Sequence, residues 1–209
     1  MFAIANSSQR LELSRKGAGS ETTQFSQEAS DRALIRAVAA GDKPAMHTLY
    51  VRHNVRVFRF ILRMTDNRSL AEDLVSEVFL DVWRKADGFK AKSQVSTWLL
   101  AIARNKVLSS LRRRSDEELD DDALAVIEDP ADDPETLAQK RDRSNIVQKC
   151  LAQLSAAHRE VLDLVYYHEK SVDEISEIIR IPASTVKTRM FYARSRMETF
   201  LRSAGVEAL

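Results

Sequence analysis

The sequence is poor in the residues that tight turns and disulfide bonds require. Among its 209 residues it has five glycines, four prolines and one cysteine, Cys150. So few turn formers, and no sustained alternation of apolar and polar positions, argue against β-hairpins and predict an all-α fold. A single cysteine excludes an internal disulfide bond and a cysteine-based zinc cluster. It is typical of proteins in a reducing compartment, so we expect a cytoplasmic protein.

Long hydrophobic runs are also missing. The chain has no stretch of about eighteen consecutive apolar residues, and the apolar residues at its start are too few for a signal-peptide core. We therefore expect neither a transmembrane helix nor secretion.

The sequence shows no arrangement of residues that points to catalysis. Its four histidines have no metal-ligand spacing, the run Asp120 to Asp122 lacks the glycine of a calcium-binding loop, and Cys150 has no partner nearby in the sequence. We expect no enzymatic activity, no cofactor and no bound metal ion.

Charges of the two signs are separated along the chain, although the formal net charge is only +1. Residues 31–114 carry 17 Lys and Arg against 8 Asp and Glu, and residues 138–209 carry 12 against 9. Residues 115–137 carry 11 acidic residues and no Lys or Arg. A basic helical segment suits a polyanionic partner, because each phosphate that it neutralises releases counterions. Nucleic acid is therefore the first candidate partner.

Helical periodicity and charge divide the chain into four parts. Residues 1–30 show no sustained period and are predicted to be a disordered extension. The acidic residues 115–137 are predicted to be a flexible linker between two small helical domains. The predicted helices are one from Asp31 to Gly41 with Asp31 as its cap, then 44–65, 69–86 and 96–114, and in the second domain (138–209) about 136–153, 156–168, 171–179 and 183–203.

The clearest local motif is a helix-turn-helix near the C-terminus. Apolar positions over residues 172–179 form one helical face, Pro182 ends that pattern, and a longer helix follows. Projection of the second helix places Phe191 and Tyr192 on its outward face, with Lys187 and Arg194 beside them. Exposed aromatic residues flanked by cations indicate a helix that enters the major groove of DNA. The alternative is a basic surface helix of a bundle, which leaves the aromatic pair unexplained.

Two more surfaces are predicted on the N-terminal domain. Leu80 and Trp83 project away from the core side of their helix, as in a protein-binding hot spot, unless Trp83 packs under a neighbouring segment. Trp98 and Asn105 share the outward face of the next helix with cations, a pattern able to bind a nucleic-acid strand. The loop before that helix either holds an unstacked base or uses Phe89 to plug the core.

Four motifs follow one another in the chain. They are Ala71-Glu-Asp-Leu with Phe79 and Trp83, Ser96-Thr-Trp-Leu-Leu-Ala-Ile-Ala-Arg-Asn, Leu154-Ser-Ala-Ala-His-Arg-Glu-Val-Leu, and Thr185-Val-Lys-Thr-Arg. Together they resemble the extracytoplasmic-function (ECF) group of bacterial sigma-70 RNA polymerase sigma factors, over about residues 31–203. The resemblance implies that residues 31–114 are sigma region 2 and residues 138–209 are region 4, without regions 1.1 and 3.

The resemblance also implies partners and site residues. The partners are core RNA polymerase, bound through its β′ clamp helices and β flap, promoter DNA, and an anti-sigma factor. By position in the motifs, the residues implied are Glu72, Asp73, Ser76, Glu77, Leu80 and Trp83 for polymerase; Phe89, Lys90, Lys92, Ser93, Trp98, Asn105, Lys106, Arg112 and Arg113 for the −10 element; and Ser184, Thr185, Lys187, Thr188, Arg189, Phe191, Tyr192 and Arg194 for the −35 element.

Some features leave alternatives open. Arg180, Ser184 and Tyr192 depart from the family pattern, so the preferred −35 sequence does not follow from the resemblance. The acidic linker either mimics a polyanion in the polymerase channels or is a plain tether. Two other functions compete: a stand-alone helix-turn-helix regulator, which has no use for the Trp98–Asn105 face, and a sigma mimic that sequesters an anti-sigma factor, which has no use for a basic DNA-reading face.

Overall fold

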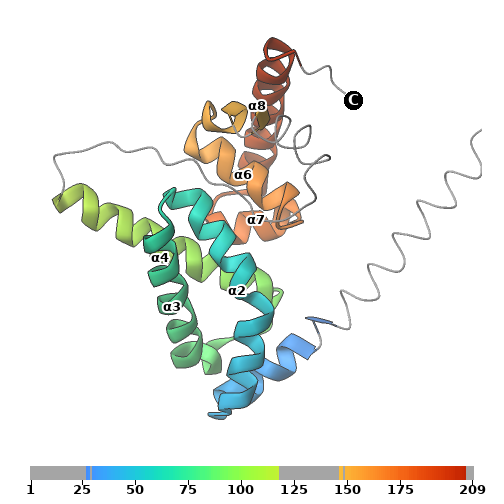
Figure 1. Ribbon diagram of the computed structural model, residues 1–209. Helices are drawn as coiled ribbons and strands as arrows, with labels where there is room; N and C mark the ends of the chain where they lie inside the picture. The colour runs from blue at the N-terminus through green and yellow to red at the C-terminus, as the bar shows by residue number, and fades with distance from the viewer. Residues whose placement is uncertain (1–26, 29, 118–145, 148, 206–209) are drawn as a thin grey trace, which may run out of the picture.

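The structure is a computed structural model that describes residues 27–28, 30–117, 146–147 and 149–205. The regular elements within these ranges are helices, which confirms the predicted all-α fold (Figure 1). After a first helix that includes residues 30–39, the elements are α2 (Lys43–Thr65), α3 (Arg68–Lys85), the short 3-10 helix η1 (Ala86–Gly88) and α4 (Val95–Glu117). Residues 149–152 are helical, and α6 (Ala156–Tyr166), α7 (Val172–Ile179) and α8 (Ala183–Ser203) follow.

Local sequence explains where the N-terminal helices begin. The Asp42 carboxylate accepts the Ala45 amide at 3.0 Å to cap α2, and Asn67 accepts the Leu70 amide at 2.9 Å to cap α3. Pro44 occupies the first turn of α2, where its missing amide is not needed. The predicted helices over 44–65 and 69–86 are therefore confirmed to within a residue or two.

Asp31 is not the helix cap that the sequence predicted. Residues 27, 28 and 30 before it are already helical, and its buried carboxylate is paired with His53, at 2.8 Å, and with Arg52. Burial alone would raise the pKa of Asp31, but the hydrogen bonds and positive charges of His53 and Arg52 outweigh it and lower the pKa. The pairing fixes the first helix against α2.

Two predicted boundaries also shift. Glu28 lies in the predicted disordered extension, yet its carboxylate accepts the Val95 amide at 3.0 Å and so fixes the start of α4. At its other end α4 continues to Glu117, three residues into the predicted linker. Residues 1–26 and 118–145, which hold most of the predicted extension and linker, lie outside the described residues.

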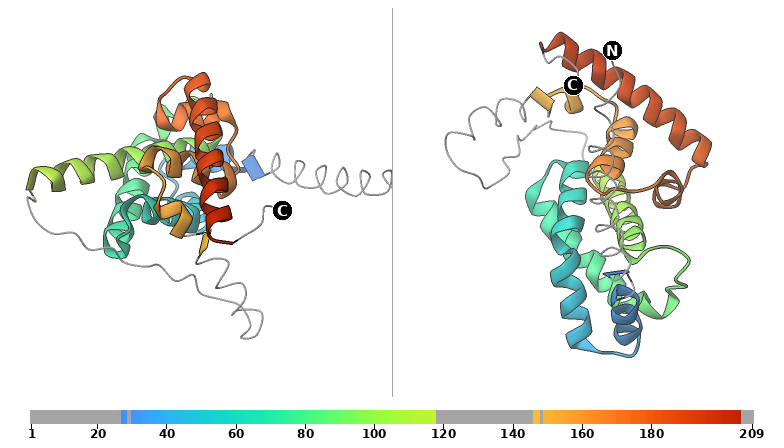
Figure 2. Two further views of the ribbon diagram at one scale, coloured as in Figure 1. Left: turned by 90° about the horizontal axis from the view of Figure 1, so that it is seen from above. Right: turned by 90° about the vertical axis from the view of Figure 1, so that its right-hand side faces the viewer.

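The N-terminal and C-terminal helices share one apolar core. Leu49 and Phe60 of α2, Leu74 of α3 and Leu99 of α4 are fully buried in it, and so is Ile175 of α7. Figures 1 and 2 show the C-terminal helices stacked on the N-terminal bundle, with the far end of α4 projecting from it. The two small helical domains predicted from the sequence are thus docked on each other. No helix of the described ranges is long and apolar enough to span a bilayer.

A capping box starts α7. The Ser171 hydroxyl accepts the Glu174 amide at 3.3 Å, and the Glu174 carboxylate accepts the Ser171 amide at 3.0 Å. Ser171→Ala should lower the free energy of unfolding by about 1 kcal/mol, measured by urea denaturation, because amides at the helix start lose a partner. Ser195→Ala, an exposed substitution within α8, is the control and should change stability by less than about 0.5 kcal/mol. Equal effects of the two would contradict the capping role.

Candidate nucleic-acid and protein interfaces

The corner between α7 and α8 has the geometry of a helix-turn-helix. α7 ends at Ile179, its C-cap Arg180 has a left-handed backbone with φ of 56°, and Pro182 precedes the first residue of α8. The Ser176 hydroxyl donates to the Ile181 carbonyl at 2.6 Å and closes the turn. Because Val186 and Ala193 bury the inner side of α8, the opposite side of the helix is open.

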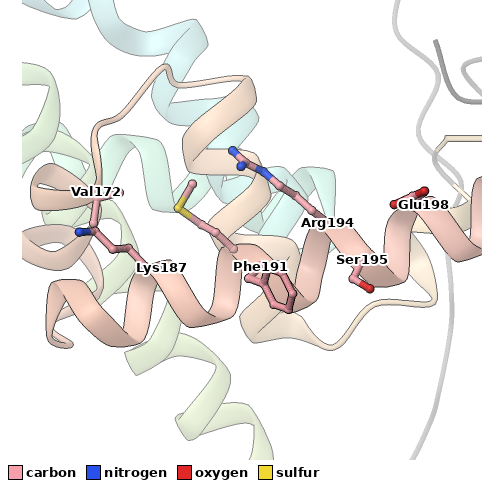
Figure 3. Close-up of a pocket in the computed structure, with 7 residues that line it drawn as sticks. Val172, Lys187, Phe191, Arg194, Ser195 and Glu198 are labelled. Atoms are coloured by element: carbon pink, nitrogen blue, oxygen red, sulfur yellow. The ribbon is translucent and has the colours of Figure 1, made fainter.

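That open side presents the aromatic pair predicted from the sequence. Phe191 is 68% exposed and Tyr192 is 54% exposed, with their rings edge to face and their centroids 5.5 Å apart. Lys187, Phe191 and Arg194 border a shallow groove of about 440 Å³, in which Figure 3 shows them spaced along α8. Ser184 and Thr188 are also exposed, while Thr185 and Arg189 are half-buried. The predicted −35 residues therefore lie together on α8, and their role in DNA binding stays a prediction.

The predicted −10 surface is only partly as the sequence suggested. Trp98 is half-buried rather than outward-facing, because its ring packs on Phe89 with 5.0 Å between centroids. Phe89 is therefore neither fully exposed in the loop nor fully buried in the core. Both rings pack against the edge of the core. Beside Trp98 lies an open depression of about 380 Å³, bordered by Arg84, Lys85, Asp87, Gly88 and Ile102.

The remaining predicted −10 residues lie in the loop before α4 and along α4. Asn105 is exposed on α4, Ser93 is half-buried, and the exposed cations are Lys90, Lys92, Arg112 and Arg113. Lys106 is different, because its ammonium is paired with Glu77 at 3.2 Å and with Asp81 at 3.5 Å. The hydrogen bond from Lys85, with help from Lys106, lowers the pKa of Asp81. Lys106 thus connects the predicted DNA surface to the predicted polymerase surface. Its ammonium already has carboxylate partners, unlike that of a lysine that is free to bind a DNA phosphate.

The predicted polymerase surface lies on α3. Glu72, Asp73, Ser76 and Leu80 are exposed, with Leu80 49% exposed, whereas Trp83 is half-buried against the core. Part of the Trp83 ring is therefore packed against the protein, as the second of the two alternatives predicted. Leu80 is the apolar side chain of this surface that is exposed to solvent. Glu77 is half-buried and paired with Lys106.

Sequence reasoning missed several exposed apolar residues. Tyr50 of α2 packs edge-on against Phe79 of α3, 4.9 Å between centroids, and Val51 and Val55 are exposed one turn apart on α2. Tyr166 and Tyr167 are exposed at the end of α6, and Tyr167 lies under the Arg63 guanidinium at 3.5 Å. The two valines could have been identified from the sequence, because they are four residues apart on the side of the helix where polar residues are expected.

Comparisons with known proteins identify the family of the chain. Family models match for Sigma-70 region 2 over residues 49–117 and for Sigma-70 region 4 over residues 144–197. The chain is 30% identical to the ECF RNA polymerase sigma factor SigW of Bacillus subtilis, over 80% of this chain and 95% of that protein. It is also 30% identical to the ECF RNA polymerase sigma factor SigK of Mycobacterium tuberculosis, over 76% and 86% of the two chains.

Two solved structures have a similar arrangement of helices. The sigma factor RpoE in complex with the anti-sigma factor NepR from Bartonella quintana superimposes with a TM-score of 0.63 at 26% identity, covering 75% of this chain and 96% of that one. CnrH in complex with the cytosolic domain of CnrY has a TM-score of 0.60 at 22% identity, covering 83% and 98%, and supports the fold alone.

Proposed function

We propose that this chain, which belongs to the ECF group of RNA polymerase sigma factors, binds core RNA polymerase in the bacterial cytoplasm and directs it to specific promoters. The observation that carries the proposal is the presence, on one chain, of both sigma regions, each with exposed side chains on its predicted DNA-binding surface. The aromatic and basic face of α8 is available to duplex DNA, and Asn105 of α4 is available to a second DNA segment.

The proposed work is divided between the two regions. α8 lies in the major groove of the −35 element, with Phe191 and Tyr192 against the base edges and Lys187 and Arg194 on the phosphates. α4 and the loop before it take the −10 element, where capture of an extruded base offsets an unpairing cost of about a few kcal/mol. The exposed surface of α3 holds the polymerase. The protein supplies binding energy and makes or breaks no covalent bond.

We also propose that an anti-sigma factor controls this protein. The similar RpoE structure was solved in complex with the anti-sigma factor NepR. The exposed apolar residues of α2 and the exposed tyrosines of α6 offer surface for a protein partner beyond what DNA requires.

Reconstituted transcription tests the main proposal. Purified protein is added to core bacterial RNA polymerase with genomic promoter fragments, and run-off transcripts are compared with those from core polymerase alone. Discrete transcripts that depend on the added protein are expected. Failure to bind core polymerase would refute the sigma assignment. DNA binding without polymerase would favour a stand-alone regulator, and anti-sigma binding without transcripts would favour a sigma mimic.

Lys187→Ala tests the −35 contact. Loss of one phosphate contact should weaken holoenzyme binding to promoter DNA and reduce the slope of log affinity against log salt by about 1. Fluorescence anisotropy over a series of salt concentrations measures both. Arg202→Ala is the matched control, because Arg202 lies near the end of α8 and is paired with Glu198 at 2.8 Å. An unchanged salt slope for Lys187→Ala would remove Lys187 from the phosphate contacts.

A further inference from the structure

Four side chains of alternating charge connect α4 to the end of α3, two helices that pack against each other (Figure 1). The Lys106 ammonium of α4 lies 3.2 Å from the Glu77 carboxylate and 3.5 Å from one oxygen of Asp81. The other oxygen of Asp81 accepts a hydrogen bond from the Lys85 ammonium at 2.8 Å. Asp81 therefore binds two lysines, one from each helix, with a separate oxygen for each. We call these four residues the Asp81 cluster.

The Asp81 cluster leaves Lys85 exposed while its other members fix the carboxylate beside it. The side chain of Asp81 is 15% exposed and that of Lys106 is 26% exposed, but that of Lys85 is 63% exposed. Because an ammonium has three donors, Lys85 keeps donors for another partner after it has bound Asp81. An exposed pair of this kind adds little to the free energy of unfolding. Its effect is on where the Lys85 ammonium lies.

Lys85 borders the open depression beside Trp98, where the predicted −10 surface begins. Arg84, which is also exposed, is a second cation at this border, and Trp98 and Ile102 supply apolar surface. The volume of about 380 Å³ lies within the range of about 300–1,000 Å³ that is typical of small-ligand sites. An aromatic ring beside cations suits a nucleotide of a single strand, because the base contacts the ring and the phosphate contacts the cations.

We propose that Lys85 binds a backbone phosphate of the −10 strand at this depression, and that Asp81 is its positioning residue, fixed in turn by Lys106. The proposal rests on the proposed function and adds Lys85 and Asp81 to the −10 surface. Lys106 then acts on DNA through Asp81, because its own ammonium is already held by two carboxylates. A lysine that is held in place beforehand loses less side-chain entropy on binding than a free one. The Asp81 carboxylate therefore favours DNA binding although it is negatively charged.

Charge and position predict opposite effects of removing the Asp81 carboxylate. On charge alone, Asp81→Asn makes the surface more positive and should tighten DNA binding. If Asp81 positions Lys85, the same substitution should weaken DNA binding, because an uncharged amide holds the ammonium less firmly. In a Lys85→Met background no ammonium is left to position, so only the charge effect acts. The effect of Asp81→Asn should therefore change sign between the two backgrounds.

Asp87→Asn is the matched control for charge. Asp87 is exposed at the border of the same depression, and its carboxylate accepts the Gly88 amide at 2.9 Å. An asparagine keeps an oxygen for that amide, so the substitution removes one negative charge and leaves the pair of Asp81 and Lys85 in place. Asp87→Asn should tighten DNA binding slightly in both backgrounds. Circular dichroism confirms that each variant keeps its helices, and titration with core polymerase confirms that each forms holoenzyme.

Affinity is measured by fluorescence anisotropy with a labelled promoter fragment whose −10 segment is left unpaired, over a series of salt concentrations. Holoenzyme with Lys85→Met should bind at least about threefold more weakly, and its slope of log affinity against log salt should fall by about 1. Asp81→Asn should weaken binding at least about twofold in the wild-type background and tighten it in the Lys85→Met background. A fragment that ends upstream of the −10 element should bind every variant with the wild-type affinity.

The possible outcomes separate this proposal from the proposed function. If Asp81→Asn tightens binding in both backgrounds, as Asp87→Asn does, Asp81 acts by charge alone and the positioning role is overturned. Weaker binding in both backgrounds would make Asp81 a structural residue and would also overturn that role. An unchanged salt slope for Lys85→Met, or an equal loss with the fragment that lacks the −10 element, would remove Lys85 from the −10 phosphates. These results arise with a wild-type holoenzyme that binds the promoter, whereas a wild type that binds no promoter would refute the proposed function and this proposal with it.

Discussion

Leu80→Asp is expected to weaken binding to core RNA polymerase at least about 30-fold, equivalent to about 2 kcal/mol. Leu80 presents nearly half of its surface to solvent among polar residues of α3, and an apolar side chain in that setting gains most from burial by a partner. An aspartate in its place loses the apolar contact and brings a charge that binding would have to desolvate. Affinity is measured by titrating labelled protein with core polymerase.

The control for this experiment is Leu111→Asp on α4. Leu111 is 38% exposed, so the same substitution is made at a similarly exposed leucine outside the proposed polymerase surface. Both variants should fold with unchanged helix content, because neither side chain lies in the core. If the two variants lose polymerase affinity to the same extent, the effect is one of added negative charge and Leu80 has no special place in the interface.

Asn105→Ala is expected to reduce discrimination between the cognate −10 element and its single-base variants by about 5- to 150-fold, while binding to core polymerase stays unchanged. The range corresponds to about 1–3 kcal/mol, the discrimination that a well-placed side-chain amide gives to one base. Asn105 is exposed on α4, so its truncation leaves the core intact. Competition between wild-type and substituted promoters in run-off assays measures the ratio.

Ser109→Ala, one turn farther along α4 and also exposed, is the matched control and should leave discrimination unchanged. Equal loss of polymerase binding and of −10 discrimination in Asn105→Ala would assign Asn105 a structural role instead. A general loss of promoter affinity without loss of discrimination would place the amide on the DNA backbone.

The sequence predicts the helices well because their signals are local. Pro44, Pro182 and the capping residues before α3 and α7 mark helix starts within a few residues, and apolar spacing marks the inner faces. The same periodicity placed Phe191 and Tyr192 outward, as found. It failed for Trp98, since a helical projection does not include the ring of Phe89 that the preceding loop folds against it.

The docking of the two units could not be read from the sequence. Arg104 and Glu160 are 56 positions apart, and nothing near either residue indicates its partner. Ser171 and Glu174 form a capping box, which by itself explains why a glutamate stands at this position. The second contact of Glu174, with Thr97, therefore leaves no sign in the sequence. Asp31 was likewise assigned to a helix cap, because its pairing with His53 depends on the packing of two helices.

The left-handed backbone of Arg180 sets stability against DNA binding at this position. A side chain in that conformation costs about 1–2 kcal/mol, a penalty that glycine avoids. Arginine nevertheless adds a positive charge just ahead of α8, the helix predicted to bind DNA, at the end where a helix favours phosphate. Directed evolution for a higher melting temperature alone would therefore select glycine at position 180. The variants with the highest melting temperatures would then bind promoter DNA with lower affinity.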